Sequence, residues 1–153
     1  MQGRQAVLIG AALVAVAAGA AAFARAEGDR FAWFAEAQAT FEGQCNVCHP
    51  LERALSKSFD REKWVTTIER MHDNGAEVDG QQRRQVVDFL FTKNVFEAKC
   101  SVCHGTDRPL GKSKSGAEWL ATVQRMAGKK PGHLAEPEIA DIAAYLAAVR
   151  PAP

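Results

Sequence analysis

The sequence predicts an all-α protein built from two tandem lobes, and three observations support this prediction. No part of the chain shows the alternation of apolar and polar residues that is typical of strands. Amphipathic segments of helical length are bounded by cap residues and by turns that contain Gly. A unit of about 55 residues also occurs twice, which predicts that two lobes repeat one order of helices.

The repeat is visible in two pairs of segments. KWVTTIERM (63–71) matches EWLATVQRM (118–126) at an offset of 55 residues. Further along, VVDFL (86–90) matches IAAYL (142–146) at an offset of 56, so one residue is inserted in the second copy. A duplicated unit accounts for both matches.

Each unit is expected to contain three helical pieces. Apolar-rich segments at 31–43 and 86–99 form the first piece of each copy. The middle helix of the second copy begins at a capping box, with Ser115 as N-cap and Glu118 three residues later. Asp60 holds the equivalent cap position in the first copy. These middle helices are predicted to end at the Gly-containing turns HDNG and AGKKPG.

A closing helix follows in the second copy. Pro137 lies near its first turn, where proline is well tolerated. One face of this helix is apolar and is expected to be buried, and it carries Ile139, Ile142, Ala143 and Leu146.

All four cysteines lie in two CxxCH blocks, which consist of Cys45, Cys48 and His49, and of Cys100, Cys103 and His104. This pattern is typical of covalent haem attachment. A spacing of three residues places both sulfurs on one side of a helical turn, where each thiol can add to one vinyl group of haem. The adjacent imidazole then provides the proximal ligand of the iron. The sequence therefore predicts two haem c groups.

Four other uses of these cysteines are less consistent with the pattern. The paired CxxC knuckles of a structural zinc site are usually ~15–20 residues apart, whereas 51 residues separate Cys48 from Cys100. A thioredoxin-type redox pair expects a βαβ setting, which this chain does not show. Structural disulfides would leave both histidines unexplained. Buried free thiols would predict no spacing at all.

The N-terminal residues 1–26 are typical of an export signal. Arg4 provides a basic start, an apolar run extends over 6–23, and Ala24-Arg25-Ala26 forms a small-residue cleavage site. Export is consistent with haem c, which is attached outside the cytoplasm. The alternative is an uncleaved membrane anchor, since 18 residues reach the lower end of the ~17–25 that span a bilayer.

We expect a periplasmic protein with a first haem lobe over 27–94 and a second over 95–153. Without the Arg4 and Arg25 of the leader, 17 of the 19 basic residues remain against 18 acidic ones. This balance gives no basic surface for nucleic acid. Phosphate-binding loops, Ser/His/Asp triads and zinc-protease motifs are not found either.

Each iron also needs a distal ligand or an open site. Met71 and Met126 each follow a proximal His by 22 residues and are the predicted distal ligands. Both could instead fill gaps in the core, which is a common role of Met. His72 is an alternative to Met71, because neighbours on a helix point ~100° apart and only one can ligate. His133 is a spare candidate in the second copy, but its position after Pro-Gly favours a solvated loop histidine.

Two further repeated pairs have two interpretations each. Trp64 and Trp119 could pack against a haem edge or belong to an ordinary core. Arg70 and Arg125 could pair with a haem propionate or stabilise the C-terminus of a helix.

Tandem CxxCH units with a W-x5-RM helix and a closing FL or YL helix resemble the small di-haem cytochromes c. The segment 35–148 is similar to the haem domain of the quinohaemoprotein amine dehydrogenase large subunit. The resemblance implies two cytochrome c-like lobes, each wrapped around a covalently bound haem, and electron transfer with His/Met or His/His ligation. The sequence departs from that subunit in ending at Pro153, so its substrate chemistry is not carried over.

Three functional hypotheses follow. The first is a periplasmic carrier of single electrons between a donor oxidoreductase and an acceptor, without catalytic residues and with redox proteins as partners. The second is a di-haem peroxidase-like enzyme, for which His72 is the nearby proton-handling group. The third is a haem subunit of a larger dehydrogenase. Contact with a membrane is expected only if the N-terminal segment stays uncleaved, and contact with nucleic acid is not expected.

Overall fold

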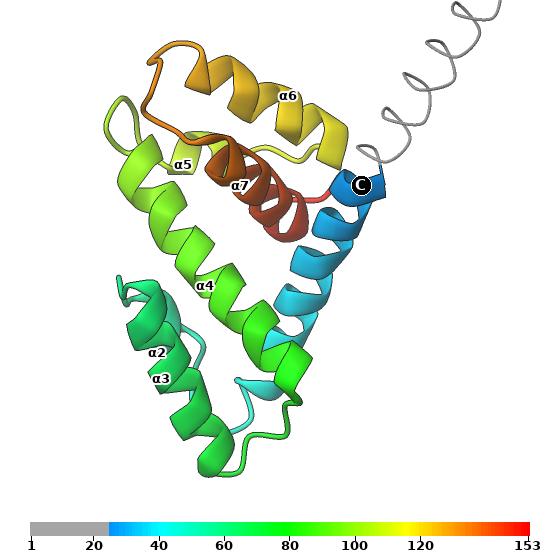
Figure 1. Ribbon diagram of the computed structural model, residues 1–153, viewed down its shortest axis with the longest axis vertical. Coiled ribbons are helices and arrows are strands. Elements are labelled where there is room, and N and C mark those ends of the chain that lie inside the picture. Colours follow the sequence, from blue (N-terminus) through cyan, green and yellow to red (C-terminus); the bar gives the residue numbers. More distant parts are fainter. Residues whose placement is uncertain (1–24) are drawn as a thin grey trace, which may run out of the picture.

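The computed structural model describes residues 25–153, and this part of the chain is all-α (Figure 1). An N-terminal helix over residues 25–44 is followed by α2 (Glu52–Leu55), α3 (Arg61–Asp73), α4 (Gly80–Cys100), α5 (Asp107–Leu110), α6 (Gly116–Ala127) and α7 (Glu136–Val149). The described residues contain no strand, and an isolated bridge joins Lys114 to Pro151. The all-α prediction is confirmed, while the wrapping of two lobes around haem stays a prediction.

One long helix, α4, belongs to both units. Its first half contains residues 86–90, which align with the closing helix of the second unit, and its last residue is Cys100. The same 21-residue helix therefore closes the first unit and leads into the second CxxCH block. The division expected after Asn94 falls inside this helix.

The apolar core is one cluster that joins both units. α4 lies between α3 on one side and α7 on the other, and α7 also packs on α6 (Figure 1). Because α4 is covered from several sides, it buries residues all around its axis: Gln85, Val86, Val87, Phe89, Leu90, Thr92, Lys93 and Phe96. At the centre, the ring of Phe89 packs on Phe41 of the N-terminal helix and on Tyr145 of α7, with centroids 5.7 and 5.2 Å apart.

The predicted helix ends of the middle helices are confirmed. The side chain of Asp60 accepts a backbone N–H at 2.7 Å at the start of α3. Ser115 and Glu118 form the reciprocal capping box of α6, in which Glu118 accepts the N–H of Ser115 at 2.8 Å. In the turns after α3 and α6, Gly75 and Gly132 have φ values of +100° and +77°, a region that glycine enters without a steric penalty.

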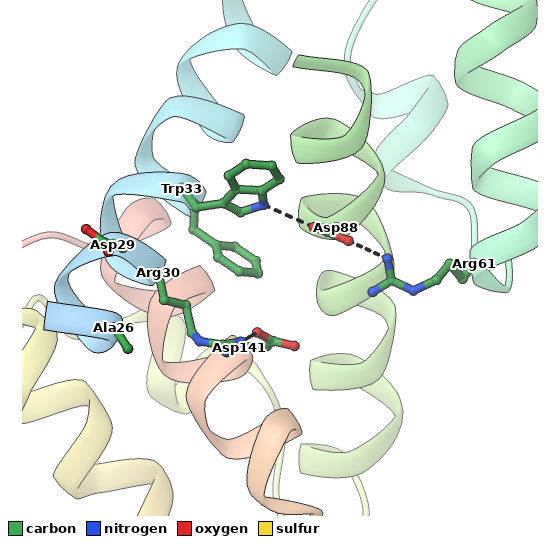
Figure 2. A pocket seen from close by; sticks show the side chains of 8 residues that line it. Ala26, Asp29, Arg30, Trp33, Arg61, Asp88 and Asp141 are labelled. Carbon is green, nitrogen blue, oxygen red and sulfur yellow. Dashed lines mark hydrogen bonds and ion pairs between the residues drawn. The ribbon is translucent and has the colours of Figure 1, made fainter. Parts of the chain in front are cut away.

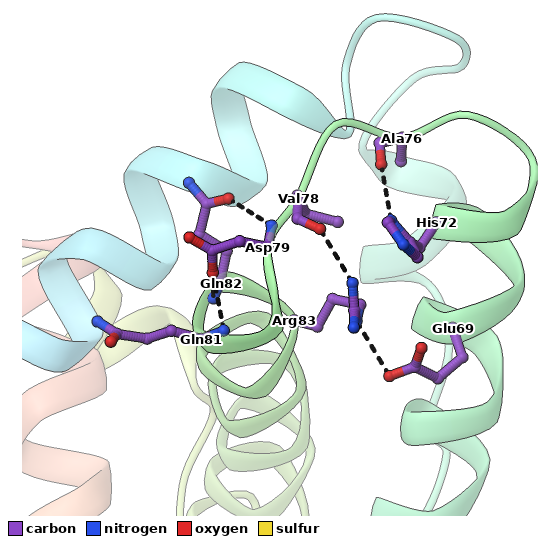
Figure 3. Close-up of polar contacts among 8 residues, drawn as sticks. All are labelled: Glu69, His72, Ala76, Val78, Asp79, Gln81, Gln82 and Arg83. Atoms are coloured by element: carbon purple, nitrogen blue, oxygen red, sulfur yellow. Dashed lines mark hydrogen bonds and ion pairs between the residues drawn. The ribbon is translucent and has the colours of Figure 1, made fainter.

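The closing helix α7 is also confirmed. Pro137 lies in its first turn, and the four apolar residues predicted to face the core are buried. A capping box at the start of α4 was not predicted (Figure 3). There Asp79 accepts the N–H of Gln82 at 2.8 Å, and Gln82 accepts the N–H of Asp79 at the same distance.

Polar contacts attach the N-terminal helix to the rest of the fold (Figure 2). Trp33 Nε1 donates to the carboxylate of Asp88 in α4 at 3.0 Å, and Asp88 also pairs with Arg61 of α3. Arg30 pairs with Asp141 of α7. These side chains line a cleft of about 350 Å³ between the N-terminal helix, α3, α4 and α7.

The predicted leader lies outside the described residues except for its last two positions, which begin the N-terminal helix. Among the helices of residues 25–153, none has the length and hydropathy needed to cross a membrane.

Candidate cofactor site

Both CxxCH blocks begin where a long helix ends. Cys45 follows the N-terminal helix and donates its N–H to the carbonyl of Phe41 at 3.1 Å, while Cys100 is the last residue of α4. All four cysteines are free thiols, with Cys45 and Cys100 half-buried and Cys48 and Cys103 exposed. The two copies therefore present their thiols in the same way.

The first cysteine of each block, Cys45 or Cys100, is more buried than the second, and this burial shifts the pKa of its thiol. It raises the pKa of the Cys45 thiol, and it raises the pKa of the Cys100 thiol together with the nearby Cys103. Cys45 and Cys100 are therefore protonated thiols at neutral pH, whereas the thiols of Cys48 and Cys103 are accessible to solvent.

The two proximal histidines make the same local contact. His49 Nδ1 lies 3.2 Å from the carbonyl oxygen of Pro50, and His104 Nδ1 lies 3.0 Å from that of Gly105. A carbonyl can only accept, so Nδ1 is the donor in both contacts, and in the neutral ring Nε2 is then the nitrogen that can bind a metal. This is how a hydrogen bond to one ring nitrogen prepares the other as a metal ligand.

A cavity of about 580 Å³ gathers the predicted site residues of the first unit. Cys45, Cys48, His49 and Met71 all line it. The rest of its wall is largely apolar and includes Phe41, Phe59, Trp64, Ile68 and Leu90. Its volume falls in the range of ~300–1,000 Å³ that is usual for cofactor pockets. Two thiols, an imidazole with a free Nε2 and a thioether on one apolar cavity suit haem c.

One face of α3 forms a wall of this cavity. Trp64, Thr67, Ile68 and Met71 line it at helical spacing. His72 is exposed and is not among the lining residues, and its Nδ1 lies 3.2 Å from the carbonyl oxygen of Ala76 (Figure 3). The structure thus places Met71 on the cavity wall and His72 outside it.

In the second unit, Met126 is half-buried in the last turn of α6. Met126 is assigned to the second CxxCH block through its position in the repeat, which is equivalent to that of Met71. The expected solvated position of His133 is wrong. Its Nε2 lies 2.9 Å from the carbonyl oxygen of Lys99, and Lys99 Nζ donates to the carbonyl of His133 at 2.9 Å. His133 therefore fastens the loop after α6 to the end of α4.

Three basic side chains line the cavity, namely Arg53, Lys57 and Arg70. The sequence analysis considered Arg70 as a partner of haem but not Arg53 or Lys57. Their positions are repeated at an offset of 55 residues by Arg108, Lys112 and Arg125. Extending the repeat from the middle helices back to the CxxCH blocks would have found this signal.

Within residues 25–153, no group of three or more His, Cys, Asp and Glu side chains is placed to hold a metal ion. Comparisons of the chain with protein-family models, with curated proteins and with solved structures found no match. The resemblance to small di-haem cytochromes c therefore stays a prediction, and the function is argued from the site residues.

Proposed function

We propose that the protein is a periplasmic di-haem c-type cytochrome, which transfers single electrons between a donor oxidoreductase and an acceptor. The main support for this proposal is the cavity of the first unit, which is lined by both thiols of a CxxCH block together with His49, Met71 and apolar side chains. The repeat extends the proposal to a second haem at Cys100, Cys103 and His104.

The chain's own residues have simple roles in this proposal. The cysteines anchor the group, and the histidines are oriented by carbonyl oxygens so that Nε2 is available. Met71 offers its thioether sulfur from the wall, and the apolar side chains limit access of water. When bound, haem supplies the one-electron chemistry, and its potential depends on the axial ligands and on burial.

The position of His72 favours a carrier over a peroxidase-like enzyme. An enzyme of that kind needs a proton-handling group in the distal pocket. His72 was the candidate for this role, and it lies outside the cavity wall.

The proposal is tested by export of the full chain with the haem-attachment machinery, followed by intact mass under denaturing conditions and by spectra of the reduced protein. We expect the mass of two haems, and no spectral change with carbon monoxide because both irons hold six ligands. A mass with one haem or none would contradict the proposal. Binding of carbon monoxide to one haem would point to the peroxidase-like enzyme, and copurification with a larger oxidoreductase at native levels would indicate a subunit.

The distal ligands are tested by three matched variants. Met71→Ala is expected to remove one thioether–iron charge-transfer band in near-infrared magnetic circular dichroism and to lower the potential of one haem, because Met/His ligation raises it. Met126→Ala should do the same at the other haem. His72→Ala is the control for the first unit and should leave both bands intact. Loss of a band in His72→Ala, with no change in Met71→Ala, would assign His72 as the ligand.

A further inference from the structure

The shared helix α4 contains a buried lysine. The side chain of Lys93 is only 7 % exposed. Its Nζ donates to the backbone carbonyl of Leu55, the last residue of α2, and pairs with Glu97 one turn later at 2.8 Å. A lysine is almost never this buried unless its charge is paired, because the removal of an ammonium group from water costs free energy.

Two observations place this charge beside the first cavity. Leu90, which lines the cavity, lies three residues before Lys93 in α4, and residues at this spacing share one face of a helix. The carbonyl that accepts from Lys93 belongs to Leu55, whose chain neighbour Ala54 lines the same cavity. The ammonium group therefore lies behind the cavity wall, between α4 and α2, and does not line the cavity itself.

The second unit has no counterpart of this charge. The closing helix α7 aligns with the first half of α4 at an offset of 56 and has Val149 at the position of Lys93. Counted back from the first CxxCH block, the same positions are Gln38 and Glu42, where Gln38 Nε2 donates to Glu42 at 2.8 Å. The basic residues of the first cavity wall, in contrast, are repeated in the second unit. The buried lysine thus distinguishes the two units.

We propose that the buried ammonium group of Lys93 raises the reduction potential of the first haem relative to that of the second. The inference rests on the proposed function and goes beyond it, because it assigns a tuning role to a residue that does not contact the cavity. The oxidised iron carries one more positive charge than the reduced iron, so a nearby cation disfavours oxidation. Because Lys93 is shielded from solvent, this effect is weakly screened. Glu97 compensates only part of it, since its side chain is 43 % exposed.

The geometry of α4 makes the effect larger at the first haem. At 1.5 Å per residue, Leu90 of the first cavity lies about 4.5 Å from Lys93 along the helix axis, whereas Cys100 of the second block lies about 10 Å away in the other direction. The side chain of Lys93 also extends toward α2 of the first unit. At equilibrium, an electron that enters at the reduced second haem therefore passes to the oxidised first haem.

The test compares the potentials of both haems in redox titrations of the holoproteins. Lys93→Met keeps an apolar side chain of similar length and removes the charge. It should lower the potential of the haem that Met71→Ala and His72→Ala assign to the first block, and lower that of the other haem less. Lys93→Arg keeps the charge and a donor for Leu55 and should restore the wild-type potential. Lys63→Met removes an exposed lysine of α3 and should leave both potentials close to those of the wild type.

A second variant separates the charge of Lys93 from its role in packing. Glu97→Gln removes the negative partner and leaves the bond between Lys93 and Leu55 in place. It should shift the potential of the first haem upward, opposite to Lys93→Met. Loosened packing would not produce two shifts of opposite sign.

The inference is overturned if Lys93→Met leaves the potential of the first haem unchanged or lowers that of the second haem more. If Lys93→Met does not fold, Glu97→Gln decides alone, and the absence of an upward shift overturns the inference. Failure of the proposed function would be distinct, since the intact mass would then show no covalent haem, whereas here both haems would be attached with potentials that do not depend on Lys93.

Discussion

The fragment 95–153 is expected not to fold, although it contains the whole second CxxCH block and the helices that follow it. It lacks residues 80–94 of α4, and this part of α4 carries Phe89 and Leu90, which are buried in the common core. In the full chain the ring of Phe89 packs on Tyr145 of α7 at 5.2 Å. Without that surface, α7 would expose its apolar face, and a unit of this size cannot compensate with a large core of its own.

A matched fragment separates this effect from simple truncation. The fragment 76–153 starts in the turn after α3 and keeps α4, α5, α6 and α7 complete. We expect it to show more helix and more near-ultraviolet circular dichroism than 95–153, because it keeps the packing of Phe89 on Tyr145, and less than the full chain, because it lacks Phe41 and α3. Equal folding of the two fragments would mean that the second lobe is independent of the first half of α4. The full chain should unfold in one cooperative transition, because its buried residues form one cluster.

Local sequence chemistry explains why the helix ends were predicted well. A cap such as Asp60 or Ser115 depends on a backbone N–H three residues away, so the necessary information is adjacent in the sequence. The continuity of α4 was harder to recognise. In the sequence, residues 86–90 match the closing helix of the second unit and also belong to the piece that opens that unit, and this overlap indicates one shared helix.

Features that depend on distant partners could not be predicted in this way. Lys93 is buried in α4 although lysine is usually exposed, because its Nζ donates to the carbonyl of the distant Leu55. The contact of His133 with Lys99 joins residues 34 apart. Likewise, the CxxCH spacing predicts a haem group, but only the packing of α3 separates Met71 from His72 at the cavity.

The other large effect is expected for Cys45→Ala/Cys48→Ala, which should lose one covalent haem and much of the stability of the whole chain. Phe41, Trp64, Ile68 and Leu90 line the first cavity and also belong to the common core. At ~24 cal/mol per Å³, a closed and dry cavity of about 580 Å³ would cost at most about 14 kcal/mol. Water that enters from the open side reduces this cost, but a third of it is already large against a total of ~5–15 kcal/mol.

We therefore expect the melting temperature to fall by more than ~10 °C, or the chain to be recovered unfolded. Because the core is shared, the absorbance of the second haem should change in the same transition as the far-ultraviolet circular dichroism. Two separated transitions would show instead that the units are energetically independent. Denaturing intact mass would establish that the remaining haem is the covalent one of the second block.

Single replacements provide the control for this double variant. Cys48→Ala keeps the thioether at Cys45, so the haem should stay attached and fill the cavity, with a much smaller loss of stability.

Cys100→Ala/Cys103→Ala tests whether the second site makes the same contribution, and its haem should be lost while that of the first block remains. An unchanged melting temperature in Cys45→Ala/Cys48→Ala, with one haem missing from the mass, would show that the first cavity does not depend on its cofactor for packing.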